Sequence, residues 1–180
     1  ASTFDPKLGY KQGRAIAKEA YFTGVRELLS PVMDLARDPR YGRCEETYGE
    51  DVYLSKEFAK EVVKGMQGEK LTDVFSVASE PKHFVAYGNP IGGLNCAPST
   101  MGRRDAFAYC LPIFESAIKK GGALNVMCSY NSIDGTPVAS DKELLTTILR
   151  DNYNMPGFVR SDMTAIAMLK TAHHIAATDK

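Results

Sequence analysis

The chain has 180 residues, 44% of them hydrophobic and 24% charged, a composition typical of a globular chain long enough to bury a core. Its 22 basic and 22 acidic side chains cancel, which excludes the strong net charge that draws a protein to nucleic acid or to an anionic membrane. A small neutral substrate fits this balance better. No run approaches the roughly 20 apolar residues that span a bilayer, and the first ten residues lack a signal-peptide pattern.

The cysteines and histidines show no metal-binding pattern. Cys44, Cys96, Cys110 and Cys128 are scattered without a C-x-x-C pair, and the three histidines have no ligand spacing to them. We therefore expect no metal site and no cofactor. Separated cysteines in a chain of this length favour the reduced thiols of a cytoplasmic protein over a disulfide framework, without fixing the compartment.

Helical and extended patterns alternate along the chain. Apolar residues at helical spacing predict helices over residues 7–23, 50–68, 103–119 and 141–152, and one more that begins at residue 165. Short apolar runs between them predict strands over residues 25–33, 75–84, 125–130 and 158–162. Strands separated by helices in this way pair in parallel through right-handed crossovers, so the fold class is α/β.

Two α/β architectures share this alternation, the doubly wound open sheet and the eight-stranded barrel. Residues 88–93 do not read G-x-G-x-x-G, and no strand is followed by Gly-Lys-Ser/Thr, so the phosphate loop of an open nucleotide-binding sheet is missing. Instead, every predicted strand ends in polar groups: Asp34, Lys82 with His83, Tyr130 with Asn131, and Ser161 with Asp162.

Barrels build their sites from such strand ends. The sequence therefore predicts part of a (β/α)8 barrel, a TIM-like fold, with about four strand-helix units in one domain over residues 1–180. The other strands are expected from the rest of a longer polypeptide or from a partner chain.

Asp162 is the first candidate functional residue because it stands where a strand passes into a helix, a position that carries catalytic groups in α/β folds. The alternative is that its carboxylate only caps the helix that follows. The residues alone leave both interpretations open.

Several separated motifs, taken in order, resemble the N-terminal barrel domain of glycoside hydrolase family 3, the β-glucosidase and β-xylosidase family. They are residues 30–34, the Arg-Asp-Pro-Arg-Tyr-Gly-Arg of 37–43, Glu46 with 48–51, Lys82-His83-Phe84, Met127 with Tyr130-Asn131, and 157–162. The resemblance covers nearly the whole chain, and the ordered set is far more specific than any one motif.

The resemblance implies that Asp162 is the catalytic nucleophile of a retaining glycosidase. It also implies that Arg43, Lys82 and His83 surround the terminal sugar, and that Tyr130 holds Asp162 while Met127 lines the pocket. Each has a structural alternative. Arg43 could simply pair with Glu46, Lys82 could be a solvated strand end, and His83 could be a core histidine. Tyr130 and Met127 could serve only to pack the strands.

The acid that protonates the leaving group is not expected here. Loop bonds and helix-terminus charges are the roles expected of Asp34, Glu45, Glu46 and Glu50, and Asp38 with Arg40 is expected to fix the shape of its loop. After Asp162 the chain offers no carboxylate beyond Asp179. In the glucosidase-like branch of the family the acid is a Glu from a later domain.

The chain also departs from the family pattern. No second histidine follows Lys82-His83-Phe84 closely, which favours the glucosidase-like branch over the N-acetylglucosaminidase branch. Gly93 stands where some relatives carry a sugar-binding arginine, and Met163 stands where many carry tryptophan. These differences bear on the subsites next to the terminal sugar.

We therefore predict a retaining β-glycosidase that releases terminal non-reducing sugars, with a β-D-glucosidase as the first choice. The alternatives are a β-xylosidase of the same family, a non-catalytic sugar-binding barrel fragment, and a phosphate-binding barrel enzyme such as an aldolase. The expected partner is a small carbohydrate, not nucleic acid or a membrane.

Overall fold

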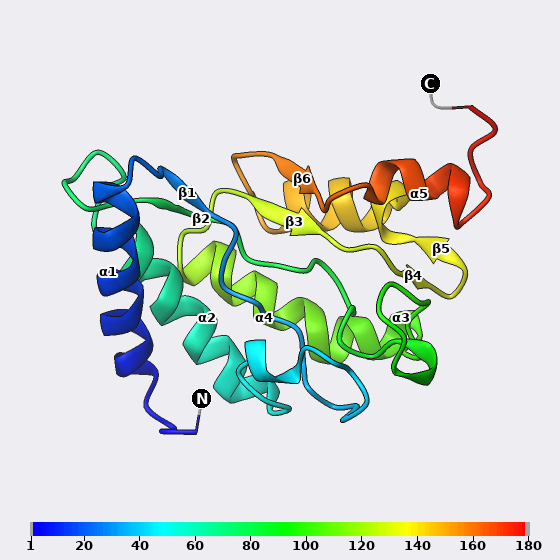
Figure 1. The fold of residues 1–180 in the computed structure, drawn as a ribbon, viewed down its shortest axis with the longest axis horizontal. Coiled ribbons are helices and arrows are strands. Elements are labelled where there is room, and N and C mark those ends of the chain that lie inside the picture. Colours follow the sequence, from blue (N-terminus) through cyan, green and yellow to red (C-terminus); the bar gives the residue numbers. More distant parts are fainter. Residues whose placement is uncertain (1, 179–180) are drawn as a thin grey trace.

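The computed structural model describes residues 2–178 (Figure 1). Helix α1 (Pro6–Phe22) is followed by α2 (Val52–Gln67), and a continuous helical stretch joins α3 (Arg103–Asp105) to α4 (Leu111–Glu115) through wider turns of π type. Similar wide turns form Ser116–Lys120 and the helix Glu143–Asn152, and α5 (Ala165–Thr171) comes last. All five predicted helices are therefore present.

Helix ends follow local signals in the sequence. Asp5 caps α1 by accepting the Lys7 N–H, and Asp51 caps α2 by accepting the Leu54 N–H at 2.6 Å. Gly68 ends α2 with φ +66°, a left-handed conformation that glycine adopts without a steric penalty.

Four short parallel strands form the sheet: β1 (Glu27–Leu28), β2 (Ala78–Ser79), β3 (Val126–Cys128) and β6 (Val159–Ser161). β1 pairs with β2, and β3 pairs with β6. The chain stays extended after β2, and residues 78–84, here called the β2 segment, end at a bridge between Phe84 and Cys128 that joins them to β3. The order of the four strands in space is thus their order in sequence, without the reversal that defines a doubly wound sheet. This is the strand order of a barrel wall.

The first two strands are shorter than the predicted runs of 25–33 and 75–84. Each run contains a proline, Pro31 or Pro81, which has no N–H to donate to a neighbouring strand. Beyond these prolines, pairing continues only as the bridge between Val32 and Lys82.

An antiparallel hairpin, β4 (Ser132–Ile133) with β5 (Thr136–Pro137), was not predicted. Its turn residues Asp134 and Gly135 have φ of +48° and +82°. Asp-Gly is the sequence signature of such a turn, so the signal was present in the chain.

The helices α2 and α4 lie on one side of the strands (Figure 1), and the main core fills the space between them. The sheet contributes Phe84, Val126 and Cys128 to this core, and the helices contribute Val63 and Phe114 among others. Because side chains alternate along a strand, residues between these, such as Met127, face the other side of the sheet. In a complete barrel that side is the interior.

Helix α1 packs closely on α2 through glycines. A Cβ atom at Gly13 would stand 2.6 Å from the Val62 carbonyl oxygen, and one at Gly65 would collide with the Tyr10 carbonyl. The two backbones can therefore approach only with glycine at these positions.

Candidate active site

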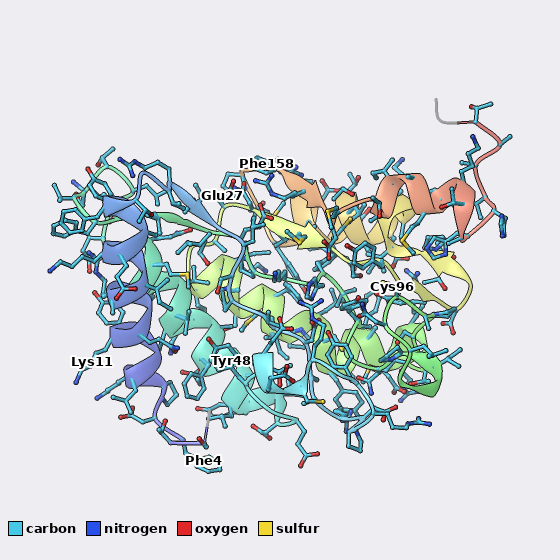
Figure 2. The ribbon with its side chains drawn as sticks, viewed as in Figure 1. Phe4, Lys11, Glu27, Tyr48, Cys96 and Phe158 are labelled. Carbon is cyan, nitrogen blue, oxygen red and sulfur yellow. The ribbon has the colours of Figure 1, made fainter. Side chains whose placement is uncertain are left out.

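The polar residues predicted at the strand ends form one group. The parallel order places the ends of β1, the β2 segment, β3 and β6 at one edge of the sheet, and Asp34, His83, Tyr130 and Asp162 meet there through direct contacts. The loop 88–99, marked in Figure 2 by Cys96, borders this edge because the Tyr87 hydroxyl donates to Asn95.

Asp162 holds the centre of the group. Its Oδ1 accepts the Tyr130 hydroxyl at 2.9 Å and the Met163 N–H at 2.7 Å, while its Oδ2 lies 3.6 Å from His83 Nε2. The side chain is 15% exposed. The N-cap position of α5 belongs to Thr164, whose φ is +67°, and the Asp162 carboxylate bonds no N–H of α5 in the described chain. The helix-cap alternative is therefore not what this carboxylate does.

His83 is fully enclosed, with a side chain 1% exposed. Its ring nitrogen Nδ1 lies 2.7 Å from Asp34 Oδ2, and its backbone N–H donates to Asp34 Oδ1 at 3.3 Å. The Tyr41 hydroxyl donates to the same Oδ2 at 3.3 Å. The expectation of a loop bond or helix-terminus charge for Asp34 was wrong, because its carboxylate is buried and bonds His83.

Arg43 pairs with Glu46, as the structural alternative for this arginine predicted. Its Nε and Nη2 donate to the two oxygens of Glu46 at 2.6 and 2.8 Å. The Arg43 pair, assisted by the charge of Lys82, holds the pKa of Glu46 below its ordinary value. The pairing leaves the outer N–H groups of the guanidinium for a ligand, since an arginine has five such donors.

Lys82 stands beside this ion pair, close enough for its charge to act on Glu46. Within residues 2–178, its ammonium group has no hydrogen-bond or ion-pair partner. A half-buried ammonium with three free donors can bind hydroxyl groups.

Two further residues were named from the sequence. Burial, together with the bond to Asp162, raises the pKa of Tyr130 to about 12, so its hydroxyl stays protonated and donates to Asp162. Met127 is 4% exposed and lies opposite Arg160 in the paired strands, so it faces the same side of the sheet as Asp162. The structure thus brings Arg43, Lys82, His83, Tyr130 and Asp162 to one end of the sheet, whereas Met127 shares only the face, opposite Arg160.

Tyr41 and Tyr87 were missed. The Tyr87 ring centroid lies 4.8 Å from that of His83 and 5.9 Å from that of Tyr130, so it packs between two site residues. Both missed tyrosines are almost fully buried. Tyr87 follows the quoted Lys82-His83-Phe84 motif by three residues, but nothing in a single sequence separates it from an ordinary core aromatic.

Gly93 explains one departure from the family pattern. It has φ +75°, and a Cβ atom here would stand 2.5 Å from the Arg40 Cβ and 2.8 Å from the Arg40 carbonyl oxygen. No side chain fits at this position, because the loop packs directly on the backbone of residue 40. The ion pair of Arg40 with Asp38, at 2.8 Å, lies within its own loop as expected.

Across the described residues 2–178, no three His, Cys, Asp or Glu side chains are grouped so that they could hold a metal ion. The four cysteines are free thiols. Within the same range no helix is both long and apolar enough to cross a bilayer. Asp179 lies outside the described residues.

The fold and site define a barrel-type α/β domain in which a carboxylate at the strand ends accepts a tyrosine hydroxyl and a backbone N–H and lies beside a histidine ring. The family model described as "Glycosyl hydrolase family 3 N terminal domain" matches residues 1–179, and the chain belongs to this family. The fold class predicted from the sequence is thereby confirmed.

Individual proteins that resemble this chain carry names that agree with the family. A β-xylosidase of Formosa agariphila is 39% identical over 98% of this chain and 25% of its own length, and a periplasmic β-glucosidase of Salmonella typhimurium is 37% identical over 94% and 22%. The solved structure of a β-glucosidase from Erythrobacter marinus matches with a TM-score of 0.92 and 37% identity, covering 96% of this chain and 23% of its own. The chain spans about a quarter of the length of these relatives.

Proposed function

We propose that this chain supplies the nucleophile and the terminal-sugar contacts of a retaining β-glycosidase, with β-D-glucoside as the first choice of substrate. The observation that carries the proposal is the Asp162 carboxylate, which has one oxygen held by two donors and the other directed at the site. The names of the family relatives, β-glucosidase and β-xylosidase, support the reaction class.

The two carboxylate oxygens of Asp162 have different surroundings. Oδ1 is fixed by Tyr130 and by the Met163 N–H, so Oδ2 is the oxygen free to attack. Its electron pair forms a bond to the anomeric carbon while the bond from that carbon to the leaving oxygen breaks, and the leaving oxygen takes a proton. Water then attacks the anomeric carbon, gives one proton back to the group that protonated the leaving oxygen, and releases Asp162 as a carboxylate.

Lys82, His83 and Arg43 are the groups that would hold the sugar. A free ammonium, a ring nitrogen beside the nucleophile and the outer N–H groups of a guanidinium bond hydroxyls at fixed positions. Such contacts place the anomeric carbon opposite Oδ2, and positioning of this kind removes much of the entropic part of the barrier.

The proton donor is proposed to come from elsewhere in the complete protein. Two other carboxylates belong to this group, and neither suits the role: Asp34 is buried behind His83, and the lowered pKa of Glu46 makes it a weak proton source. Replacing Glu46 by Gln should therefore slow the hydrolysis of an alkyl glycoside and of a dinitrophenyl glycoside by the same factor. A loss confined to the alkyl glycoside would make Glu46 the acid.

The remaining barrel strands are also proposed to come from the rest of the protein. Within the described chain, the outer edges of β1 and β6 pair with no strand. Large apolar side chains near β6 are exposed, among them Phe158 at 47%, Met163 at 79% and Ile166 at 56%. Exposed strand edges with apolar neighbours are normally covered in a folded protein.

The experiment that tests the nucleophile is covalent trapping in the full-length protein. A 2-deoxy-2-fluoro glucoside with a good leaving group should label a peptide that contains Asp162, because the fluorine slows breakdown of the glycosyl-enzyme. The product of ordinary hydrolysis should first appear as the β-anomer. Labelling of another carboxylate, or inversion at the anomeric carbon, would refute the proposal.

The preferred sugar needs its own measurement, because one relative named β-xylosidase and another named β-glucosidase match this chain at similar identity. Xylose lacks the hydroxymethyl group of glucose, so kcat/KM for the two nitrophenyl sugars compares binding of that group. A higher value for the xyloside would replace glucosidase with xylosidase and leave the role of Asp162 unchanged.

A further inference from the structure

We propose that Asp34 is a positioning residue of this glycosidase, which fixes the ring of His83 with Nδ1 as a proton donor and thereby turns Nε2 toward the nucleophile and the sugar. The inference rests on the proposed function for its catalytic consequence, but its structural part stands on the contacts of Asp34 alone. Both side chains are 1% exposed, so water does not compete for these contacts.

The Asp34 carboxylate serves three donors at once. Oδ2 lies 2.7 Å from His83 Nδ1 and accepts the Tyr41 hydroxyl at 3.3 Å, while Oδ1 accepts the backbone N–H of His83. Because both oxygens already accept, Oδ1 from an N–H and Oδ2 from an O–H, we take the carboxylate as the acceptor of the 2.7 Å contact too, with the proton on the ring nitrogen. The short contact therefore assigns the proton to Nδ1, and Nε2 is the nitrogen that faces Asp162 Oδ2 at 3.6 Å.

Neighbouring groups pack against both the His83 ring and the Asp34 side chain. The Tyr87 ring packs against the His83 ring with centroids 4.8 Å apart. On the other side, a Cβ atom added at Gly88 would stand only 3.2 Å from the Asp34 Cβ, so the loop after the β2 segment is packed against this aspartate. The hydrogen bond from His83 Nδ1 to Asp34 consequently decides which ring nitrogen enters the site.

This arrangement has a chemical consequence for a sugar-binding histidine. Rotation of the ring by half a turn would exchange a carbon for Nε2 near Asp162 and remove one hydroxyl contact. Loss of the outer partner of a metal-binding histidine typically costs about 10- to 100-fold in affinity or activity, and we expect an effect of the same scale for this sugar-binding histidine. Asp34 would act entirely through His83, since Asp162 and Asp34 lie on opposite sides of the ring.

The kinetic test is a double-mutant cycle in the full-length protein, with a dinitrophenyl glucoside as substrate. Asp34→Ala should lower kcat/KM about 10- to 100-fold, and Asp34→Asn should recover part of the loss, because an amide offers one acceptor oxygen. In a His83→Ala background neither change should alter the rate more than about twofold. Tyr41→Phe, which removes only the third donor, is the matched control and should stay within about threefold of wild type.

A spectroscopic measurement reports the ring state of His83 directly. In protein carrying ¹⁵N-labelled histidine, the His83 signals are identified by their loss in His83→Ala, and Nδ1 should carry a proton throughout the pH range of the folded protein. In Asp34→Ala or Asp34→Asn, the proton should redistribute between the two ring nitrogens. If Asp34→Ala does not fold, the wild-type spectrum and the Asn variant still decide.

Two results would overturn the proposal: an unprotonated Nδ1 in the wild-type spectrum, or the same loss from Asp34→Ala with and without His83. The second result would make Asp34 a structural residue. Failure of the proposed function looks different, because the wild-type protein would then hydrolyse no nitrophenyl sugar while the spectrum would still report the ring state of His83.

Discussion

Two charged clusters lie on the same face of the sheet, and they differ in how completely their charges are paired. The upper cluster, at the strand ends, is Asp34, His83 and Asp162 with Lys82 beside them. Asp162 Oδ2 is 3.6 Å from its nearest cation-forming group, and the Lys82 ammonium has no partner within the described residues. Its groups keep unused hydrogen-bonding capacity.

The lower cluster, toward the strand starts, is Glu27, Glu80 and Arg160. Arg160 Nε contacts both oxygens of Glu80 at 2.9 and 3.0 Å, and its Nη2 contacts Glu27 at 2.5 Å. Asn125 joins Glu27 to the Phe158 N–H, so these residues lie together where Figure 2 labels Glu27 and Phe158. Here every charged group bonds another member of the cluster.

Arg160 and Asp162 are two residues apart at the end of β6, and so are Glu80 and Lys82 in the segment that follows β2, yet their environments differ. A closed network contributes rigidity, whereas open donors and an open carboxylate are available to a ligand. Most barrels place apolar side chains in the layers beneath the site. We therefore expect the upper cluster to control turnover and the lower cluster to control stability.

The largest effect should follow from Asp162→Asn. The amide keeps the shape of the side chain but cannot attack the anomeric carbon, so kcat should fall at least about ten-thousandfold. The melting temperature should change by only a few degrees. Asp151→Asn, an exposed carboxylate on the helix Glu143–Asn152, is the matched control. Residual turnover above about one part in a hundred would remove Asp162 from the role of nucleophile.

The second effect concerns the lower cluster. Burial raises the pKa of Glu80 to about 7, against the lowering influence of Arg160. The folded protein therefore holds a proton that the unfolded chain releases from about pH 4.5 upward, and stability contributed by this group falls as pH rises toward 7. Arg160→Met leaves Glu80 without its cation and should cost about 2 to 3 kcal/mol at pH 8, and less at pH 5.

Melting temperatures at the two pH values measure this effect. Glu80→Gln is the control, since a neutral amide should flatten the pH dependence. If Arg160→Met loses stability equally at pH 5 and pH 8, then ionisation of Glu80 is not the cause. If turnover falls as much as for Asp162→Asn while the fold is intact, the division of roles between the clusters is wrong.

The sequence predicted the elements that carry the two clusters, but not the contacts within the clusters. Helix bounds followed from local signals such as Asp5, Asp51 and Gly68, because capping depends on neighbours a few residues away. Helix-strand alternation predicted parallel pairing, and the polar strand ends predicted the edge where the site lies. These features depend on periodicity, which one sequence contains.

The partners of the charged groups could not be predicted in the same way. Asp34 and His83 are 49 residues apart, and Glu27 and Arg160 are 133 apart, so their pairing depends on how the strands stack. A loop bond or helix-terminus charge was expected of Asp34, because a single sequence shows only its local surroundings. The hairpin at Asp134 and Gly135 is different: its turn signature was present and was not used.

The third effect is the loss of a donor from the upper cluster. Lys82→Met keeps most of the length of the side chain and removes the ammonium. The transition-state stabilisation calculated from kcat/KM should fall by about 1 to 3 kcal/mol, the scale of a lost charge-assisted hydrogen bond. Stability should be almost unchanged, since this ammonium has no partner among residues 2–178. Lys11→Met, on the outer helix α1, is the control. Unchanged kinetics would make Lys82 a solvated strand end.

The smallest effect is expected for Tyr130→Phe, which tests how Asp162 is held. The change removes the 2.9 Å hydrogen bond to Oδ1 but keeps the ring, and the Met163 N–H still bonds the same oxygen. One lost hydrogen bond of this kind is worth about 1 kcal/mol, or roughly fivefold in kcat. Because the pKa of Tyr130 is raised to about 12, its hydroxyl is protonated at every pH at which turnover is measured, so the pH profiles of the two proteins should have the same shape. Tyr53→Phe, exposed on α2, is the control. A profile that changes shape would show that Tyr130 takes part in proton transfer, and its hydroxyl would then belong to the chemistry of the site instead of its geometry.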